Sequence, residues 1–125
     1  MHLTALGAPD LDTYLRNDWE ASFMRRRAAN CHAQLVTWYH GDISANTLYH
    51  GDLPRALKSI KARVLLLPSE TDLYFRVADN ALELAHLSAA ELLPIPSSWG
   101  HRAGNPAANP RDAAFLKNAV RRWLA

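Results

Sequence analysis

Apolar residues recur at helical spacing in the first part of the chain. Between residues 11 and 27 they form one stripe with charged residues between them: Leu11, Tyr14, Leu15, Trp19 and Phe23. This spacing is that of one helix face, so the segment predicts an amphipathic helix. A second short helix is expected over residues 31–40, followed by a loop over residues 41–46. Asp52 is expected to cap a further short helix over residues 53–58.

The pattern changes to short apolar runs in the second half of the chain. Residues 63–68 form a continuous run that ends at a proline, and such runs are typical of strands buried on both faces of a parallel sheet. Residues 92–96 predict a second strand, which its prolines place at a sheet edge or a strand end. Residues 77–87 lie between the runs with helical spacing. The order strand–helix–strand predicts a βαβ unit with a right-handed connection.

The last segment of the chain predicts the clearest helix. Asn109 is a candidate N-cap, Pro110 fits the first helical position, and Asp112 places a negative charge in the first turn. The apolar residues that follow share one face: Phe115, Leu116, Ala119, Val120, Trp123 and Leu124. This face must pack on another element. Since two parallel strands do not form a stable sheet alone, the chain is expected to be the tail of a larger doubly wound α/β domain.

Composition and charge are those of an ordinary globular chain. The 125 residues are 49% hydrophobic and 21% charged, with a net charge of +2, which indicates neither disorder nor a nucleic-acid binder. One cysteine, Cys31, excludes an internal disulfide framework. No apolar run approaches the roughly 18 residues of a membrane helix. The expectation is a cytoplasmic protein without a membrane or nucleic-acid partner.

Polar residues that could carry chemistry follow both predicted strands. Asp72 lies in the loop after the first strand, and His101 lies in the loop after the second. In open parallel sheets such loops gather at one edge, so the two side chains are expected to meet. A carboxylate beside an imidazole fixes the tautomer of the ring for proton transfer. The alternative is a turn residue at Asp72 and a structural loop histidine at His101.

A short repeat offers a second candidate site. The sequence Tyr-His-Gly-Asp occurs at residues 39–42 and again at residues 49–52. A histidine two residues before an aspartate could suggest metal binding, but the spacing places no third ligand. We therefore expect no metal site and no bound cofactor.

Three segments carry a family resemblance. Residues 37–46 read TWYHGDISAN, residues 71–75 read TDLYF, and residues 99–101 read WGH. In this order they resemble the C-terminal part of the homoserine O-acetyltransferase-like group of α/β-hydrolase-fold proteins. The resemblance implies two parallel strands with flanking helices, preceded by helical lid segments. Residues 1–58 would be the lid-like region and residues 59–125 the C-terminal βαβα part of the core.

The resemblance also implies roles for single residues. In that fold the triad runs Ser…Asp…His along the chain, so Asp72 would be its acid and His101 its base. Ser44 and Trp38 would border the substrate tunnel. Apart from the resemblance, Trp99 is a candidate pocket residue beside His101. Arg102 stands where homoserine acetyltransferases typically carry an aspartate that holds the substrate's ammonium group, and its charge would repel that group.

The serine nucleophile is missing from these 125 residues, because no serine stands in a Gly-x-Ser-x-Gly motif. The chain is therefore expected to be a C-terminal fragment of an acyltransferase or esterase, nearly inactive alone. The full-length family would take a small acyl donor, such as acetyl-CoA, and an alcohol or water as acceptor. The alternative is a non-catalytic remnant or interaction module that needs a second copy or a complementing N-terminal half.

Overall fold

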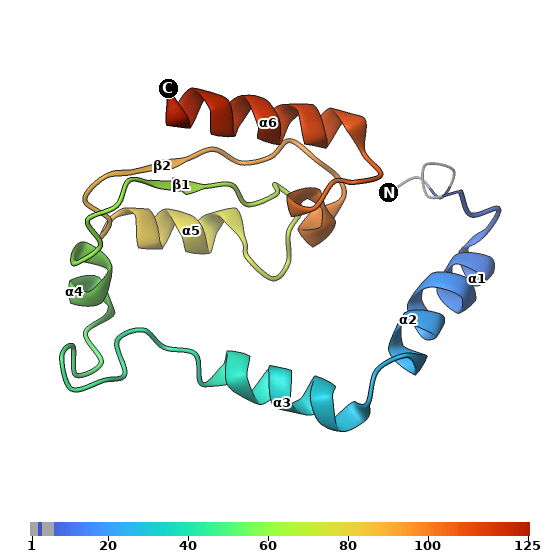
Figure 1. Cartoon of the computed structure of the whole chain (residues 1–125), viewed down its shortest axis with the longest axis horizontal. Helices are drawn as coiled ribbons and strands as arrows, with labels where there is room; N and C mark the ends of the chain where they lie inside the picture. Colours follow the sequence, from blue (N-terminus) through green and yellow to red (C-terminus); the bar gives the residue numbers. More distant parts are fainter. Residues whose placement is uncertain (1–2, 4–6) are drawn as a thin grey trace. The chain divides into compact units, whose positions relative to one another are not determined.

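The computed structural model describes residue 3 and residues 7–125 (Figure 1). The chain divides into two compact units, Met1–Ile43 and Ser44–Ala125. Helix α4 (Leu53–Lys58), expected within the lid-like region of residues 1–58, lies in the second unit. The assignment of residues 1–58 to a lid stays a prediction.

The described part of the first unit contains helices and no strands. They are α1 (Leu11–Tyr14), a π-helical segment (Leu15–Glu20), α2 (Ala21–Met24) and α3 (Ala28–Tyr39). The helix predicted over residues 11–27 thus ends at Met24 and contains a wider π-helical section. The side chain of Asp10 caps its start by accepting a hydrogen bond from the Thr13 amide at 2.7 Å. Tyr14 is buried, whereas most of the apolar stripe is exposed.

The second unit contains a two-stranded parallel sheet. Strand β1 (Val64–Leu66) pairs with β2 (Ala90–Leu92), and the helix α5 (Val77–Leu84) connects them. The register places Leu65 opposite Glu91. This βαβ unit confirms the predicted element order, and the arrangement of helices around a small parallel sheet is consistent with a partial α/β fold. The strand residues are half-buried, so the predicted burial on both strand faces is wrong for the described chain.

The second strand begins and ends earlier than the sequence pattern predicted. It covers residues 90–92 instead of 92–96, because Pro94 and Pro96 have no amide hydrogen to donate to a strand ladder. Pairing resumes once between the two prolines, as an isolated bridge between Ser69 and Ile95. The Ile95 amide donates to the Pro68 carbonyl at 2.8 Å. Ile95 is fully buried, so this bridge holds the two loops together just after the strands.

Helix α6 (Pro110–Leu124) begins where the capping signals placed it. Asn109 accepts a hydrogen bond from the Asp112 amide at 3.2 Å, and Pro110 is the first helical residue. Figure 1 shows the two strands between α5 and α6. Two contacts fasten α6 to the sheet region. The Arg63 guanidinium lies 4.2 Å from the centroid of the Trp123 ring, and Arg122 donates to the Glu91 carboxylate at 2.6 Å.

Two helix bounds differ slightly from the predictions. Helix α3 begins at Ala28 instead of residue 31, and α5 ends at Leu84 instead of residue 87. The cap predicted for α4 is confirmed, since the Asp52 side chain accepts from the Arg55 amide at 2.9 Å. No helix in the described part of the chain combines the length and apolarity needed to cross a membrane.

Candidate active site

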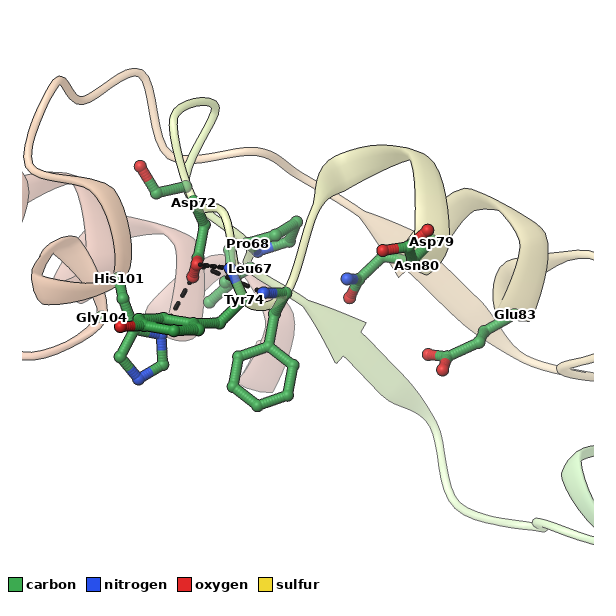
Figure 2. A pocket seen from close by; sticks show the side chains of 11 residues that line it. Leu67, Pro68, Asp72, Tyr74, Asp79, Asn80, Glu83, His101 and Gly104 are labelled. Carbon is green, nitrogen blue, oxygen red and sulfur yellow. Dashed lines mark hydrogen bonds and ion pairs between the residues drawn. The ribbon is translucent and has the colours of Figure 1, made fainter. Parts of the chain in front are cut away.

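Asp72 and His101 meet at the edge of the sheet where both strands end. Asp72 follows β1 and His101 follows β2 in a short 3₁₀-helix, Gly100–Gly104. Because the strands are parallel, their carboxyl ends lie together and the two loops converge. The Nδ1 atom of His101 lies 3.0 Å from Oδ2 of Asp72 (Figure 2). The sequence prediction that these two side chains meet is confirmed by this distance.

The carboxylate of Asp72 is buried and hydrogen-bonded through both oxygens. Its exposed fraction is 7%. Oδ1 accepts hydrogen bonds from the amides of Tyr74 at 2.8 Å and Phe75 at 3.2 Å, while Oδ2 faces His101. Burial raises the pKa of Asp72, but the hydrogen bonds from His101 and the two amides outweigh burial and hold this pKa below 3.8. Asp72 is therefore a carboxylate at neutral pH.

The ring of His101 is oriented but open to solvent. Since an ionised carboxylate only accepts hydrogen bonds, Nδ1 of His101 must be the donor in the contact with Asp72. In the neutral ring, this arrangement leaves Nε2 without a proton and able to act as a base. The ring edge meets Tyr74 at 5.3 Å between centroids, and the Phe75 ring lies at 5.4 Å. The His101 side chain remains 53% exposed, so a reactant can reach it.

Gly100 allows the sharp turn that presents His101. Its φ of +56° lies in the left-handed region, which favours glycine. An added Cβ would also lie 3.4 Å from the Thr71 carbonyl oxygen.

His101 borders two hollows on the surface of the second unit. The first, of about 530 Å³, is lined by the Asp72–His101 pair, by the rings of Tyr74 and Phe75, and by the polar side chains Asp79, Asn80 and Glu83 on α5 (Figure 2). The second, of about 600 Å³, includes Trp99 and Arg102 in its lining. Substrate could approach the imidazole from either side.

The other residues singled out in the sequence lie in different surroundings. Trp99 and Arg102 adjoin each other, with the guanidinium 5.7 Å from the indole centroid. Ser44 is 1% exposed in the turn before α4 and is not among the described residues that line either hollow. Trp38 lies on α3 in the first unit and is half-exposed. The substrate roles expected for these four residues remain predictions.

Several residues of the site were not singled out by the sequence pattern. Tyr74 and Phe75 were noted only within the family-like segment, yet they supply both amides and rings to the pair. The usable signal was local, because aspartate side chains often bond backbone amides two residues further on. Among the described residues, no group of three or more His, Cys, Asp or Glu could hold a metal ion.

Comparisons with known proteins give esterases and related hydrolases. No protein-family model matches the chain. The chain is 41% identical over 64 residues to a probable esterase of Corynebacterium glutamicum, a match that covers 51% of this chain. It is 30% identical over 97 residues to ethyl acetate hydrolase of Pseudomonas veronii, which covers 78% of this chain. The chain spans only 18% and 27% of the lengths of these two relatives.

A solved structure is similar to nearly the whole chain. It is the trigonal crystal structure of an acetylester hydrolase from Corynebacterium glutamicum, with a TM-score of 0.86 and 26% sequence identity. The similarity covers 98% of this chain and 35% of that chain. Together, the esterase relatives and this structural neighbour support an α/β-hydrolase-type family.

Proposed function

We propose that this chain supplies the acid and the base of an ester hydrolase with an α/β-hydrolase-type fold. The observation that carries the proposal is the 3.0 Å contact between His101 Nδ1 and Asp72 Oδ2. Both residues follow parallel strands, the place where reactive groups of open α/β sheets gather. The relatives named above as an esterase, an ethyl acetate hydrolase and an acetylester hydrolase support short acetyl esters as the substrate class.

The proposed mechanism has two steps through an acyl-enzyme. Nε2 of His101 takes the proton of a serine hydroxyl as that oxygen attacks the ester carbonyl, and it returns the proton to the leaving alcohol. His101 then deprotonates a water molecule as its oxygen attacks the acyl carbon. The bond between that carbon and the serine oxygen breaks, the proton passes from His101 to the serine oxygen, and the carboxylic acid leaves. Asp72 holds the imidazole and stabilises the imidazolium that forms in each step. The 125 residues contain no Gly-x-Ser-x-Gly motif, so this serine and the oxyanion donors come from outside them.

Arg102 favours hydrolysis of an uncharged ester over acyl transfer to homoserine. It directly follows His101 and borders the second hollow. A guanidinium at this position repels an ammonium group on an incoming acceptor. Water carries no such charge. We therefore propose water as the acyl acceptor and retain acetyl-CoA only as an alternative acyl donor.

A second candidate function is that of an interaction module. Exposed apolar side chains on α3, among them Leu35, Trp38 and Tyr39, favour it because such surface is costly to leave in water. The occupant would be a second copy of this chain or a complementing N-terminal half.

The test of the proposed function is ester turnover in a chimera. In the solved acetylester hydrolase, the segment that superposes on this chain is replaced by the 125 residues, so that the nucleophile is supplied by the remaining chain. We expect hydrolysis of p-nitrophenyl acetate, and we expect His101→Ala to lower kcat by about 10⁴- to 10⁶-fold. His86→Ala, which removes an exposed histidine after α5, is the matched control and should leave turnover unchanged.

Two outcomes contradict the proposed function. One is a folded chimera, verified by circular dichroism, that has no turnover or keeps its turnover in His101→Ala. The other is His101-dependent turnover by the 125-residue chain alone, because that result would place a nucleophile within these residues.

A further inference from the structure

The hydroxyl group of Thr71 makes two hydrogen bonds between the loop of Asp72 and the loop of His101. Thr71 directly precedes Asp72, and Gly100 directly precedes His101. Thr71 Oγ1 donates a hydrogen bond to the Ser97 carbonyl at 2.8 Å and accepts one from the Gly100 amide at 3.0 Å. The hydroxyl thus uses its donor and its acceptor function on the same neighbouring loop, 26 and 29 residues away in sequence.

Ser97 is held in place because it is buried and hydrogen-bonded to α6. Its hydroxyl donates to Oδ2 of Asp112, a buried carboxylate in the first turn of that helix. The same hydroxyl oxygen accepts from the Trp99 amide at 3.1 Å. Through Ser97, Thr71 therefore connects the Asp72 loop to a segment that is held by a helix.

His101 needs such a connection because packing alone does not hold its ring. The side chain is 53% exposed. The strand pairs end at Leu66 and Leu92, and the Ser69–Ile95 bridge lies before the functional residues. Beyond that bridge, the hydrogen bond from the Gly100 amide to the Thr71 side chain joins the two loops next to the reacting side chains.

We propose that Thr71 is a positioning residue for the Asp72–His101 pair. Its hydroxyl sets the separation of the two loops, and this separation keeps the imidazole within hydrogen-bonding distance of the carboxylate. Thr71 acts through Gly100 and Ser97, not by touching the imidazole. The inference rests on the proposed function, in which the oriented imidazole is the base.

Ser69 provides a matched comparison within the same loop. Its hydroxyl also donates to the Ser97 carbonyl, at 3.2 Å, and it is more buried than Thr71. The Ser69 hydroxyl oxygen accepts a hydrogen bond from the Thr71 amide at 3.4 Å and makes none with Gly100. Loss of the Ser69 hydroxyl therefore removes a bond to the same carbonyl while the link to Gly100 remains.

The experiment measures the His101 ring by NMR in the 125-residue chain. Long-range ¹H–¹⁵N spectra report the tautomer, and the exchange rate of the Nδ1 proton with water reports how firmly Asp72 holds it. The wild type is expected to show one tautomer with the proton on Nδ1. In Thr71→Val we expect a tautomer mixture and exchange about fivefold to tenfold faster, from the loss of two neutral hydrogen bonds. Thr71→Ser keeps the hydroxyl and should restore both signals, and Ser69→Ala should retain them.

The reference variant is Asp72→Asn, which should lose the single tautomer entirely. If Thr71→Val keeps the wild-type signals while Asp72→Asn loses them, the role of Thr71 is overturned and the proposed function stands. If Asp72→Asn also keeps them, the pair itself is not formed and the proposed function fails. Thr71→Ala removes the hydroxyl without adding a methyl group, so it gives the same test should the valine variant fail to fold; wild-type signals in it overturn the proposal.

Discussion

The two carboxylate oxygens of Asp72 contact different loops. Oδ1 accepts the amides of Tyr74 and Phe75, which belong to its own loop, and Oδ2 holds Nδ1 of His101 from the other loop. The local bonds require no distant partner, so the carboxylate can be oriented before the histidine is in place. This residue-scale arrangement explains how the TDLYF segment can orient the Asp72 carboxylate through local bonds.

The lowered pKa of Asp72 predicts a loss of stability in acid. The pKa of Asp72 in the folded chain lies below 3.8, its ordinary value. The ionised side chain therefore stabilises the fold at pH values above 3.8, and this contribution is lost as the pH falls through the folded-state pKa. At neutral pH, Asp72→Asn should lower the free energy of unfolding by about 1–2 kcal/mol. The difference between variant and wild type should shrink as the pH falls below 3.8.

Urea unfolding across this pH range measures that difference. Asp12→Asn, at an exposed position on α1, is the matched control. A difference between Asp72→Asn and wild type that stays constant with pH would show that the carboxylate charge does not contribute.

Elements differ in how much of them the sequence could predict, and the difference follows from the range of their hydrogen bonds. Asn109 and Pro110 locate the start of α6 because capping involves residues three positions apart. The bounds of β2 depend on the strand it pairs with, so an apolar run placed it two residues too late. The roles of Thr71 and Asp112 were missed for the same reason, since their partners lie on other elements.

The bond between Ser97 and Asp112 predicts strong coupling between the loop before His101 and α6. Both side chains are buried, and removal of either takes the bond between them from the other. Ser97 Oγ then keeps only the Trp99 amide, and Asp112 Oδ2 keeps only the Asn109 side-chain amide. We expect Ser97→Ala and Asp112→Ala each to lower the free energy of unfolding by about 1–3 kcal/mol. The double variant should cost less than the sum of the two single variants, because both single variants lose the same hydrogen bond.

A double-mutant cycle in urea tests this coupling. Additive losses in the double variant would show that the two groups stabilise the fold independently. Ser98→Ala, next to Ser97 but exposed, is the control and should change the free energy of unfolding little.

At the scale of the whole molecule, sequence and comparisons agree on an α/β-hydrolase-type family but not on the finer chemistry. The Asp72 and His101 positions, the parallel strand pair and the α/β class could be predicted, because strand order and loop position are local patterns. The homoserine O-acetyltransferase-like resemblance was less specific, since the relatives found are named as hydrolases. Specificity depends on the pocket walls, and segments far apart in the chain supply them.

The exposed apolar face of α3 predicts self-association of the isolated chain. Side chains there include Leu35, Val36, Trp38 and Tyr39. Light scattering after size exclusion should give a mass above 14.0 kDa that increases with concentration. Leu35→Glu should reduce it, whereas Gln34→Glu adds the same charge at an exposed polar position and should not. A monomer with cooperative unfolding at all concentrations contradicts this expectation.

The parallel register of β1 and β2 restricts where insertions and deletions can be accepted. A slip of one residue between the strands would shift one loop against the other by about 3.3 Å along the sheet. That shift exceeds the range of a hydrogen bond, so the Asp72–His101 contact exists in one register only. Added residues between α5 and β2 would leave this alignment intact, whereas one residue added between β2 and His101 would abolish it. Length variation among natural homologues should therefore concentrate before β2 and be rare after it.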